Sequence, residues 1–430
     1  MLVLVAGAAL VLVTRSDGGA ASSDFGAGPG SEPDEAWAVD LDHGDDDDVS
    51  VLSDGERAYV LTATEIDDDE DFSSMVTVTA YAAGDGEELW SEELEGDLFD
   101  DPVRLLGDDQ LLLGDSDGDG DESTRLLDAA TGDEVWEADG RPVDTQLALG
   151  YFGPTIDPGD LDEILLTTED DDGDQSVVAI DRESGDELWD EDGDDALVCE
   201  DVVVTIVEGE TDSETFTPAP AEITGRDDTT GDELWTRDAL PGLCDDGEIA
   251  LGTGDGEITL VDVETGDEGT VFDPPGHGDF LIAIPFGDHV AVSQYSFSEE
   301  EDDALAQASV HPRDGGDPIW EEDDTFVFPI TDDLLIAADD SNEDATLIRV
   351  SDGEELGEIP VNGDENECDG ALTHLTVVVC ETGDPDVTSY RLDTDVEELW
   401  TVDAGADVVQ VAVGGDTLFA VTEDELVALR

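Results

Sequence analysis

Hydrophobic and polar residues alternate in short runs along most of the chain, and the runs end at clusters of Gly, Asp, Ser or Thr. After Trp136, for example, the runs QLALGYF, EILLTTE and SVVAID follow one another. A period of two residues predicts half-buried β-strands. No window offers the roughly 10–12 residues of 3.6-residue period, free of Gly or Asp, that a helix requires. We therefore expect an all-β protein.

One segment recurs eight times and sets the register of the whole chain. It consists of apolar alternation, an Asp, a Thr/Ser-Gly-Asp/Glu turn and a short strand that carries Trp. Glycine adopts the positive φ of such a turn, and Asp and Thr side chains bond its backbone. Because the Trp follows at a fixed offset, we expect it to dock against the neighbouring unit. The copies are AYAAGDGEELW (ending at Trp90), LLDAATGDEVW (Trp136), VAIDRESGDELW (Trp189), ITGRDDTTGDELW (Trp235) and the weaker ITLVDVETGDEGT (Thr270), SVHPRDGGDPIW (Trp320), LIRVSDGEELG (Gly357) and SYRLDTDVEELW (Trp400).

The spacing of these copies predicts a β-propeller. Successive end positions lie 46, 53, 46, 35, 50, 37 and 43 residues apart, and each interval holds three further strand-like runs. Four strands per unit of about 40–50 residues is typical of a propeller blade. Residues 408–430 supply only three strands, so we expect the strand around Trp37 to complete that blade and close the ring. Counting gives nine antiparallel blades; because propellers usually have about four to eight, we favour eight, with nine as the alternative.

The repeated segment resembles the tryptophan-docking motif of the PQQ-type (pyrroloquinoline quinone) propeller repeat. The resemblance covers about residues 36–430 and is strongest in Leu127 to Trp136, Ile180 to Trp189 and Asp227 to Trp235. It implies a structural docking role for the seven tryptophans, Trp37, Trp90, Trp136, Trp189, Trp235, Trp320 and Trp400. One branch of the family holds PQQ and calcium in a central funnel, and the other comprises scaffolds similar to the assembly lipoprotein BamB, which present loops to protein partners.

The chain lacks the signature of the quinone-binding branch. Quinoprotein dehydrogenases often carry two adjacent cysteines, and this chain has no vicinal Cys pair. We therefore expect a non-enzymatic, monomeric scaffold with no catalytic residues and no cofactor. The alternatives are a PQQ-dependent dehydrogenase and a propeller that binds envelope polysaccharide. Residues 65–74 and 207–222 read as the longest loops between strands and are the expected contact surfaces.

The charge of the chain points to a salt-loving organism such as a haloarchaeon. There are 121 acidic residues against 12 basic ones, a formal charge of −109, and every basic residue is Arg. The carboxylates are interleaved with Val, Leu and Ile, which indicates a folded acidic surface, not a disordered tail. In molar salt the screening length falls to about 3 Å, so such a surface is tolerated. The charge argues against nucleic acid as a partner.

The N-terminal residues indicate export. Residues 1–13 form an apolar run, which is shorter than the roughly 17–25 residues of a membrane span and suits a signal-peptide core or a trimmed anchor. We expect a signal or anchor segment at 1–15, a flexible Gly/Ser/Ala-rich tether at 16–35 and the propeller at 36–430. The protein is then anchored or secreted at the outer face of the cell membrane, where it meets protein partners. The alternative is that residues 1–13 form a buried strand.

One acidic loop resembles the first half of a calcium-binding loop. Its pattern is D-x-D-x-D-G, but the twelfth position is Leu126 and not the bidentate Glu of an EF-hand. In so acidic a chain the run is also expected by chance, so a structural calcium competes with a solvated acidic hairpin. The candidate ligands are Asp115, Asp117, Asp119 and Asp121.

The cysteines carry more information than the histidines. Cys199 and Cys244 hold similar positions in adjacent units, and Cys368 and Cys380 flank one strand. An even count in an exported protein favours two disulfides, 199–244 and 368–380; buried free thiols are the alternative. The five histidines show no zinc-like spacing and are expected to be surface or strand residues. They are His43, His277, His289, His311 and His374.

Overall fold

The computed structural model describes most of the chain. The described residues are 33–41, 48–66, 73–96, 103–107, 109–116, 122–143, 163–169, 175–207, 209, 220–253, 256–274, 280–297, 304–339, 344–360, 371–373, 376–380, 385–422 and 424–430. The predicted signal segment and almost all of the predicted tether lie outside these residues.

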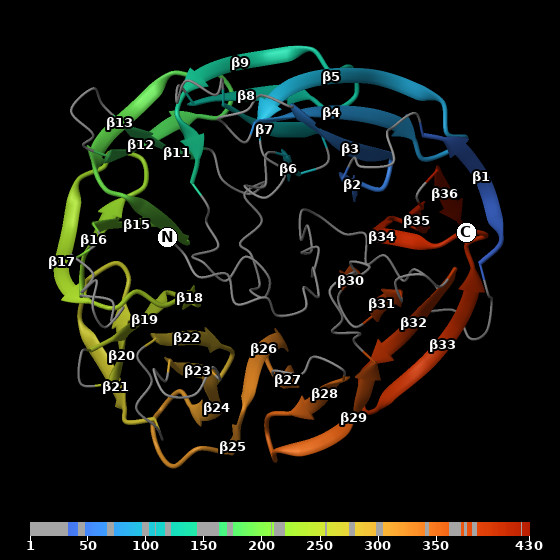
Figure 1. Ribbon diagram of the computed structural model, residues 1–430. Helices are drawn as coiled ribbons and strands as arrows, with labels where there is room; N and C mark the ends of the chain where they lie inside the picture. The colour runs from blue at the N-terminus through green and yellow to red at the C-terminus, as the bar shows by residue number, and fades with distance from the viewer. Residues whose placement is uncertain are drawn as a thin grey trace.

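Nine four-stranded antiparallel sheets are arranged as blades around a central axis (Figure 1). This confirms the predicted all-β propeller. It also corrects the preference for eight blades. The weak intervals that end at Thr270 and Gly357 are complete four-stranded sheets, because their strands keep the alternating pattern where the Trp is missing.

Eight blades are continuous in sequence, and we number them in chain order. Blade 1 comprises β2 (Asp48–Ser53), β3 (Arg57–Ile66), β4 (Ser73–Ala82) and β5 (Glu88–Gly96). Blade 2 comprises β6 (Val103–Leu106), β7 (Gln110–Ser116), β8 (Glu122–Asp128) and β9 (Glu134–Asp139). Blade 3 comprises β10 (Arg141–Pro142), β11 (Glu163–Glu169), β12 (Gln175–Asp181) and β13 (Glu187–Asp192). Blade 4 comprises β14 (Asp195–Cys199), β15 (Val202–Val207), β16 (Ala221–Asp227) and β17 (Glu233–Ala239).

The second half of the ring follows the same plan. Blade 5 comprises β18 (Cys244–Asp245), β19 (Glu248–Gly252), β20 (Ile258–Asp262) and β21 (Glu268–Phe272). Blade 6 comprises β22 (Phe280–Phe286), β23 (His289–Phe297), β24 (Ala304–Pro312) and β25 (Trp320–Asp323). Blade 7 comprises β26 (Thr325–Thr331), β27 (Leu334–Asp339), β28 (Asp344–Arg349) and β29 (Glu354–Pro360). Blade 8 comprises β30 (Ala371–Thr373), β31 (Thr376–Cys380), β32 (Asp386–Leu392) and β33 (Val396–Asp403). Blade 9 comprises β34 (Val408–Gly414), β35 (Thr417–Thr422), β36 (Glu425–Leu429) and β1 (Glu35–Asp40).

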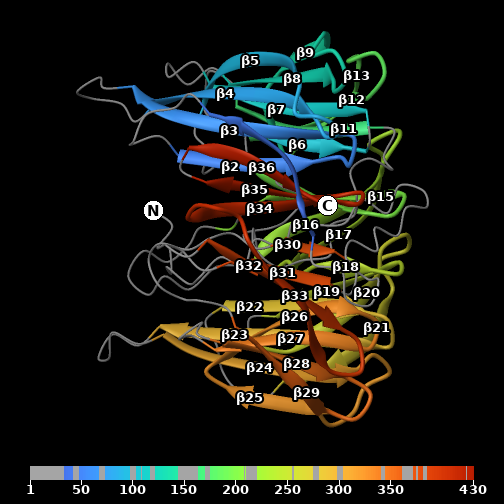
Figure 2. The same ribbon diagram turned by 90° about the vertical axis from the view of Figure 1, so that its right-hand side faces the viewer.

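The first strand of each blade lies nearest the axis and the fourth lies at the outer rim (Figure 1). The first-to-second and third-to-fourth connections therefore meet at one face of the ring, which we call the turn face. The second-to-third connections and the passages between blades meet at the other, which we call the loop face and which lies on the left in Figure 2. Strands β3 and β4 take up two residues at each end of the predicted loop 65–74, and β15 and β16 shorten the predicted loop 207–222.

The hydrophobic core is divided among the junctions between blades. One cluster joins Leu126 and Trp136 of blade 2 to Leu166 and Val178 of blade 3. The other clusters likewise combine residues of adjacent blades. Each blade is buried on both sides, so stability depends on an unbroken ring.

The two ends of the propeller sequence close the ring, as predicted. Strand β1 pairs with β36 so that Trp37 lies opposite Ala428. Beyond the strands, the backbone N–H of Asp34 donates to the Arg430 carbonyl at 2.8 Å, and the Arg430 N–H donates back at 3.0 Å. The Arg430 guanidinium also donates to the Ala83 carbonyl of blade 1 at 2.5 Å. One side chain thus ties blade 9 to blade 1.

Candidate functional site

The repeated segment builds an inter-blade joint in which Trp docks on the turn of the next blade. Trp136 of β9 donates from its indole N–H to the carbonyl of Arg182, in the turn of blade 3, at 2.9 Å. Four further tryptophans make the equivalent bond; they are Trp37 to Ala83 (2.8 Å), Trp90 to Ala129 (3.0 Å), Trp189 to Asp228 (2.5 Å) and Trp235 to Val263 (2.6 Å). Five consecutive junctions, from blade 9 to blade 5, therefore share one geometry.

The glycine of each turn is required by both conformation and space. Gly185 has φ +72°, and a Cβ at this position would lie 2.7 Å from the Trp136 Cγ. Only glycine meets both demands without strain. The neighbouring Asp181 accepts bonds from the Ser184 hydroxyl at 2.7 Å and the Ser184 N–H at 2.8 Å, and these bonds lower the pKa of Asp181. Packing against the Trp and hydrogen bonding within the turn therefore explain why the motif recurs.

The residue before each docking Trp is an exposed β-bulge. In β5, β9, β13 and β17 the register shifts so that this residue has no partner on the third strand. A bulge increases local twist and re-aims the following side chain, which here is the Trp. The bulge residues are 41–44% exposed although they are aliphatic; they are Leu89, Val135, Leu188 and Leu234.

The remaining junctions depart from this geometry. Thr270 and Gly357 stand at the Trp position of blades 5 and 7. Trp320 is half-buried and packs against the core between blades 6 and 7. Trp400 is 5% exposed and belongs to the core between blades 8 and 9. The Trp docking geometry is therefore confined to the five consecutive junctions from blade 9 to blade 5, and the other four junctions are built differently.

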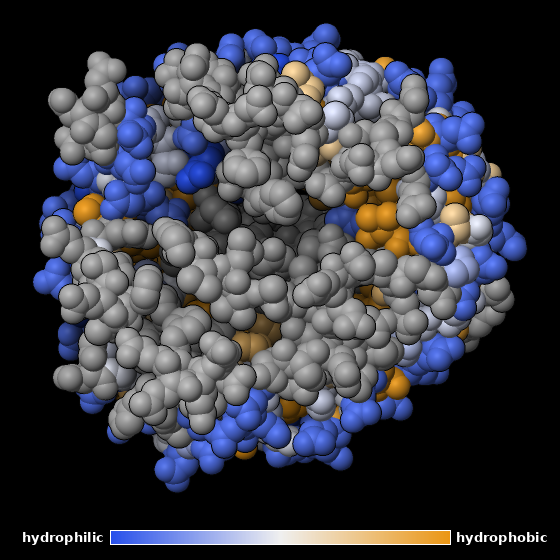
Figure 3. Space-filling model, viewed as in Figure 1, coloured by the Kyte–Doolittle hydropathy of each residue, from blue (hydrophilic) through white to orange (hydrophobic). Residues whose placement is uncertain are grey.

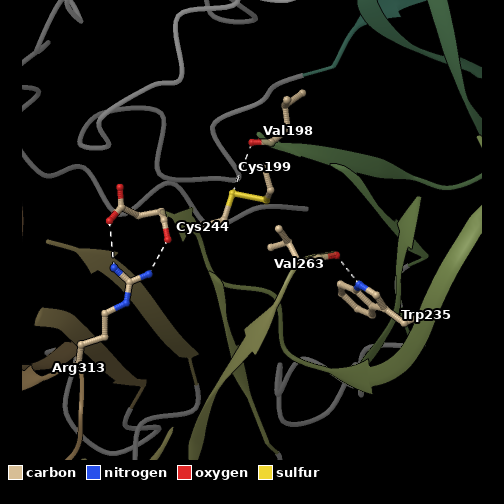
Figure 4. The surroundings of a disulfide bond; sticks show 7 residues. Val198, Cys199, Trp235, Cys244, Val263 and Arg313 are labelled. Atoms are coloured by element: carbon tan, nitrogen blue, oxygen red, sulfur yellow. Dashed lines mark hydrogen bonds and ion pairs between the residues drawn. A yellow bond between two sulfur atoms is a disulfide. The ribbon is translucent and has the colours of Figure 1, made fainter. Parts of the chain in front are cut away.

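A disulfide links the inner strands of blades 4 and 5 at the turn face (Figure 4). It joins Cys199, at the end of β14, to Cys244, at the start of β18, with the two Cα atoms 5.8 Å apart. Arg313 from the turn of blade 6 donates to the Asp245 carbonyl at 2.6 Å and pairs with Glu248 at 2.6 Å. The short inner strand of blade 5 is thus tied to both neighbours. Cys380 is also disulfide-bonded, while Cys368 lies outside the described residues.

A buried polar network occupies the first hairpin of blade 1. The Asp54 carboxylate is 1% exposed, pairs with the Arg57 guanidinium at 2.9 Å and accepts the Tyr59 hydroxyl at 2.6 Å. It also accepts the backbone N–H groups of Glu56 and Arg57 at 2.8 and 2.7 Å. Burial, followed by the nearby Asp54 carboxylate, raises the pKa of Tyr59 far above its usual range. All the donors to Asp54 belong to the same hairpin, so the network is explained by packing and turn chemistry.

Almost every described arginine is engaged within the protein. Those that pair with carboxylates are Arg57, Arg125, Arg226, Arg237, Arg313, Arg349 and Arg391. Those that donate to carbonyl, amide or hydroxyl oxygens are Arg104, Arg182 and Arg430. Of the eleven described arginines only Arg141, which is exposed, has neither kind of bond from its guanidinium within the described part of the chain.

Arg141 lies at the loop-face end of the inner strand of blade 3. Its backbone is fixed, because Arg141 pairs with Thr167 and the preceding Gly140 approaches the Thr167 carbonyl too closely for any Cβ. The adjacent inner strand β6 carries Arg104, which donates to the Val143 carbonyl at 2.5 Å. Two guanidinium groups therefore lie on neighbouring inner strands near the axis.

The inner strands differ in charge from the rest of the chain. Across β2, β6, β10, β14, β18, β22, β26, β30 and β34, Arg104 and Arg141 stand against only Asp48, Asp195 and Asp245. In Figure 3 hydrophilic residues cover the outer rim of the loop face, and hydrophobic residues appear beside the central hollow. Among the described residues, the inner strands thus repel an anionic group less than the rest of the ring does.

Most of the predicted metal site lies outside the described residues. Asp117, Asp119 and Asp121 lie outside the described residues, and Asp115 is described only as backbone near the end of β7. Within the described ranges, no group of His, Cys, Asp and Glu side chains could hold a metal ion. In the same ranges no helix is long and apolar enough to cross a membrane.

Two features of the molecule could not be inferred from the sequence: the guanidinium of Arg141, which is unpaired among the described residues, and the burial of His311. Arg141 looks like any other arginine in sequence, since only the fold shows that it lacks a carboxylate partner. His311 was expected at the surface or in a strand, and it is a strand residue with only 2% exposure. Its Nε2 lies 3.0 Å from the Ser309 hydroxyl, and its ring lies 5.8 Å from that of Phe272 in blade 5. The only available signal was its place in the repeat, where Leu127 and Ile180 are apolar.

The fold and its joints define a β-propeller of the tryptophan-docked, PQQ-repeat class. The family model described as outer membrane protein assembly factor BamB matches residues 32–196, 74–241 and 173–430. The chain therefore belongs to the BamB family. No curated protein sequence matches it.

Solved structures with a similar fold are distant. BamB from Moraxella catarrhalis is 13% identical, with 93% of this chain and 100% of that chain covered and a TM-score of 0.41. Quinohemoprotein alcohol dehydrogenase ADHIIG from Pseudomonas putida HK5 is 13% identical, with 84% and 72% covered and a TM-score of 0.43. The quinohemoprotein alcohol dehydrogenase of Comamonas testosteroni is 11% identical, with 97% and 78% covered and a TM-score of 0.46.

Proposed function

We propose that this chain is a non-enzymatic scaffold that binds a protein partner at its loop face, outside the cell membrane of a halophile. Membership of the BamB family over residues 32–430 supports a scaffold, because the match spans the whole ring. The apolar run at 1–13 and the Gly/Ser/Ala-rich stretch after it support export.

The exposed guanidinium of Arg141 is the main evidence that the loop face is the contact face. It is an exposed cation, held by a fixed backbone near the axis, in a chain with 121 acidic residues. An ion pair with a carboxylate of a partner is the interaction that such a group offers. The strand ends that border residues 65–74 and 207–222 lie on the same face. A partner that contacts both the loops and the axis approaches from this side.

The acidic surface supports function in concentrated salt. At about 0.15 M salt the Debye length is near 8 Å, and repulsion among more than a hundred net negative charges opposes a compact ring. At about 1 M salt the length falls to near 3 Å. We expect the ring to unfold on dialysis to low salt and to refold when KCl is restored, as measured by tryptophan fluorescence.

The test is co-purification of tagged protein from native membranes kept in molar KCl. We compare the wild type with Arg141→Gln and with Arg349→Gln, a matched loss of one positive charge at a residue already paired with Glu354. One defined protein partner should be recovered with the wild type and with Arg349→Gln and be depleted with Arg141→Gln. Equal recovery with all three chains would remove Arg141 from the contact face.

The same preparation separates the scaffold from its alternatives. PQQ and Ca²⁺ are added in molar KCl, and dye reduction is followed with alcohols and sugars. Turnover would replace the scaffold with a quinone-dependent dehydrogenase. Recovery of polysaccharide without protein would replace it with an envelope-binding propeller.

A further inference from the structure

The junction between blades 5 and 6 is built without the tryptophan joint. Thr270 stands at the Trp position, and its Cγ2 lies 3.2 Å from where a Cβ on Gly315 would be. The core of this junction comprises Ala250, Ile258, Leu260 and Phe272 of blade 5 with Ala283, Val290 and Val292 of blade 6. No indole spans it, and Phe272 is the one aromatic residue in the described part of its core.

A buried histidine packs against that phenylalanine. His311 on β24 is 2% exposed, and its ring lies 5.8 Å from the Phe272 ring. Its Nε2 faces the Ser309 hydroxyl at 3.0 Å, whereas Nδ1 has no hydrogen bond of ordinary geometry with the described residues. A neutral imidazole suits this place, because a charged one loses its hydration and forms no ion pair with a carboxylate of the described residues.

The charged groups around His311 do not compensate for its burial. Those on the elements packed around it are Glu321, Glu322 and Asp323 of β25, His289 of β23, Glu268 of β21, Asp262 of β20, Glu248 of β19, and Arg313, Asp314 and Asp317 of the turn that follows β24. Burial lowers the pKa of His311, and the backbone of Gly316 and the Glu321 carboxylate oppose this only in part.

We propose that the junction between blades 5 and 6 is the acid-sensitive joint of the ring, and that protonation of His311 opens it before the other junctions. In the open junction the imidazole has its ordinary pKa of about 6.5. The closed junction resists the proton, so below that pH the open form gains stability relative to the closed form. One proton changes the opening equilibrium by at most about tenfold per pH unit. This inference is independent of the partner at the loop face.

A second titrating group near the joint acts in the opposite sense. Burial raises the pKa of Asp245, and the nearby Asp246 and Asp332 add to this, whereas Arg313 lowers it. The closed form therefore holds a proton on Asp245 more tightly than the open form does, and acid stabilises the closed form through this residue. The two groups are distinguishable, since Asp245→Asn removes only the opposing effect.

The test is hydrogen–deuterium exchange with mass spectrometry in molar KCl, corrected for the intrinsic pH dependence of exchange. Between pH 7.5 and 5.5 the protection of β22 and β24 in the wild type should fall by up to about tenfold. The junction between blades 7 and 8, which also lacks a Trp, is the internal reference; protection of β28 and β32 should change less. His311→Phe should abolish the pH step, and His289→Gln should keep it.

Two outcomes would overturn the proposal. One is a wild-type step no larger at β22 and β24 than at β28 and β32. The other is a step that persists in His311→Phe. His311→Gln provides the same comparison without an added ring, so a folding defect in the Phe variant leaves the test intact.

Discussion

Replacing Gly185 with alanine should weaken the joint between blades 2 and 3. Gly185 has φ +72°, and the new Cβ would lie 2.7 Å from the Trp136 Cγ and 2.8 Å from its Cβ. The left-handed conformation costs an alanine about 1–2 kcal/mol. Overpacking against the indole costs about 1–3 kcal/mol more. We expect the free energy of unfolding to fall by about 2–5 kcal/mol.

Two further glycines separate these two costs. Gly405 has φ +92° with no heavy atom within 4 Å of its added Cβ, so Gly405→Ala measures conformational strain alone. Gly84 has neither positive φ nor a close neighbour, so Gly84→Ala should change stability by no more than about 0.5 kcal/mol. Urea unfolding followed by tryptophan fluorescence in molar KCl gives all three values. If Gly185→Ala costs no more than Gly405→Ala, the Trp–Gly contact is not the rigid joint described above.

Three other changes probe the ring at separate points. Trp136→Phe removes the indole N–H bond and should cost at least about 1 kcal/mol in urea unfolding; no loss would mean that the bond to Arg182 is dispensable. Replacing Cys199 and Cys244 together with Ser opens a loop of 45 residues and should cost up to about 4 kcal/mol, and adding reductant to the wild type should reproduce the loss. Asp54→Asn should cost about 3–5 kcal/mol because it removes the buried counter-charge of the Arg57 guanidinium, whose second carboxylate partner, Glu56, is exposed. It should also lower the pKa of Tyr59 in an alkaline absorbance titration; an unchanged pKa would contradict the network.

The parts of the fold that depend on local sequence could be predicted. The turn glycine and the alternating strands act within one repeat, so the register of Trp136 and the closing strand around Trp37 follow from the chain alone. The number of blades was harder to predict. Propellers usually have about four to eight blades, which argued against counting the weak copies at Thr270 and Gly357 as blades. A strand forms where apolar and polar residues alternate and a neighbouring strand can pair with it. Blades 5 and 7 therefore form without a Trp.

The candidate site could not be predicted in the same way. Whether Arg141 finds a carboxylate depends on which residues the ring brings within reach of it, and in an acidic chain the sequence suggests that every arginine is paired. The burial of His311 depends on Phe272, a residue of another blade. Properties that arise across a junction require the relative position of two blades, which no single repeat encodes.

The pairing of β1 with β36 sets the order in which the protein can become complete. Blades 1 to 8 each consist of consecutive strands and can form as the chain emerges. Blade 9 cannot, because the strand around Trp37 must wait for residues 425–429. Until then the strand around Trp37 has no partner, and the blades at both ends of the growing arc each expose an apolar face; both features favour wrong association. The interval between the first strand and the last is therefore the period in which the protein most needs protection from aggregation.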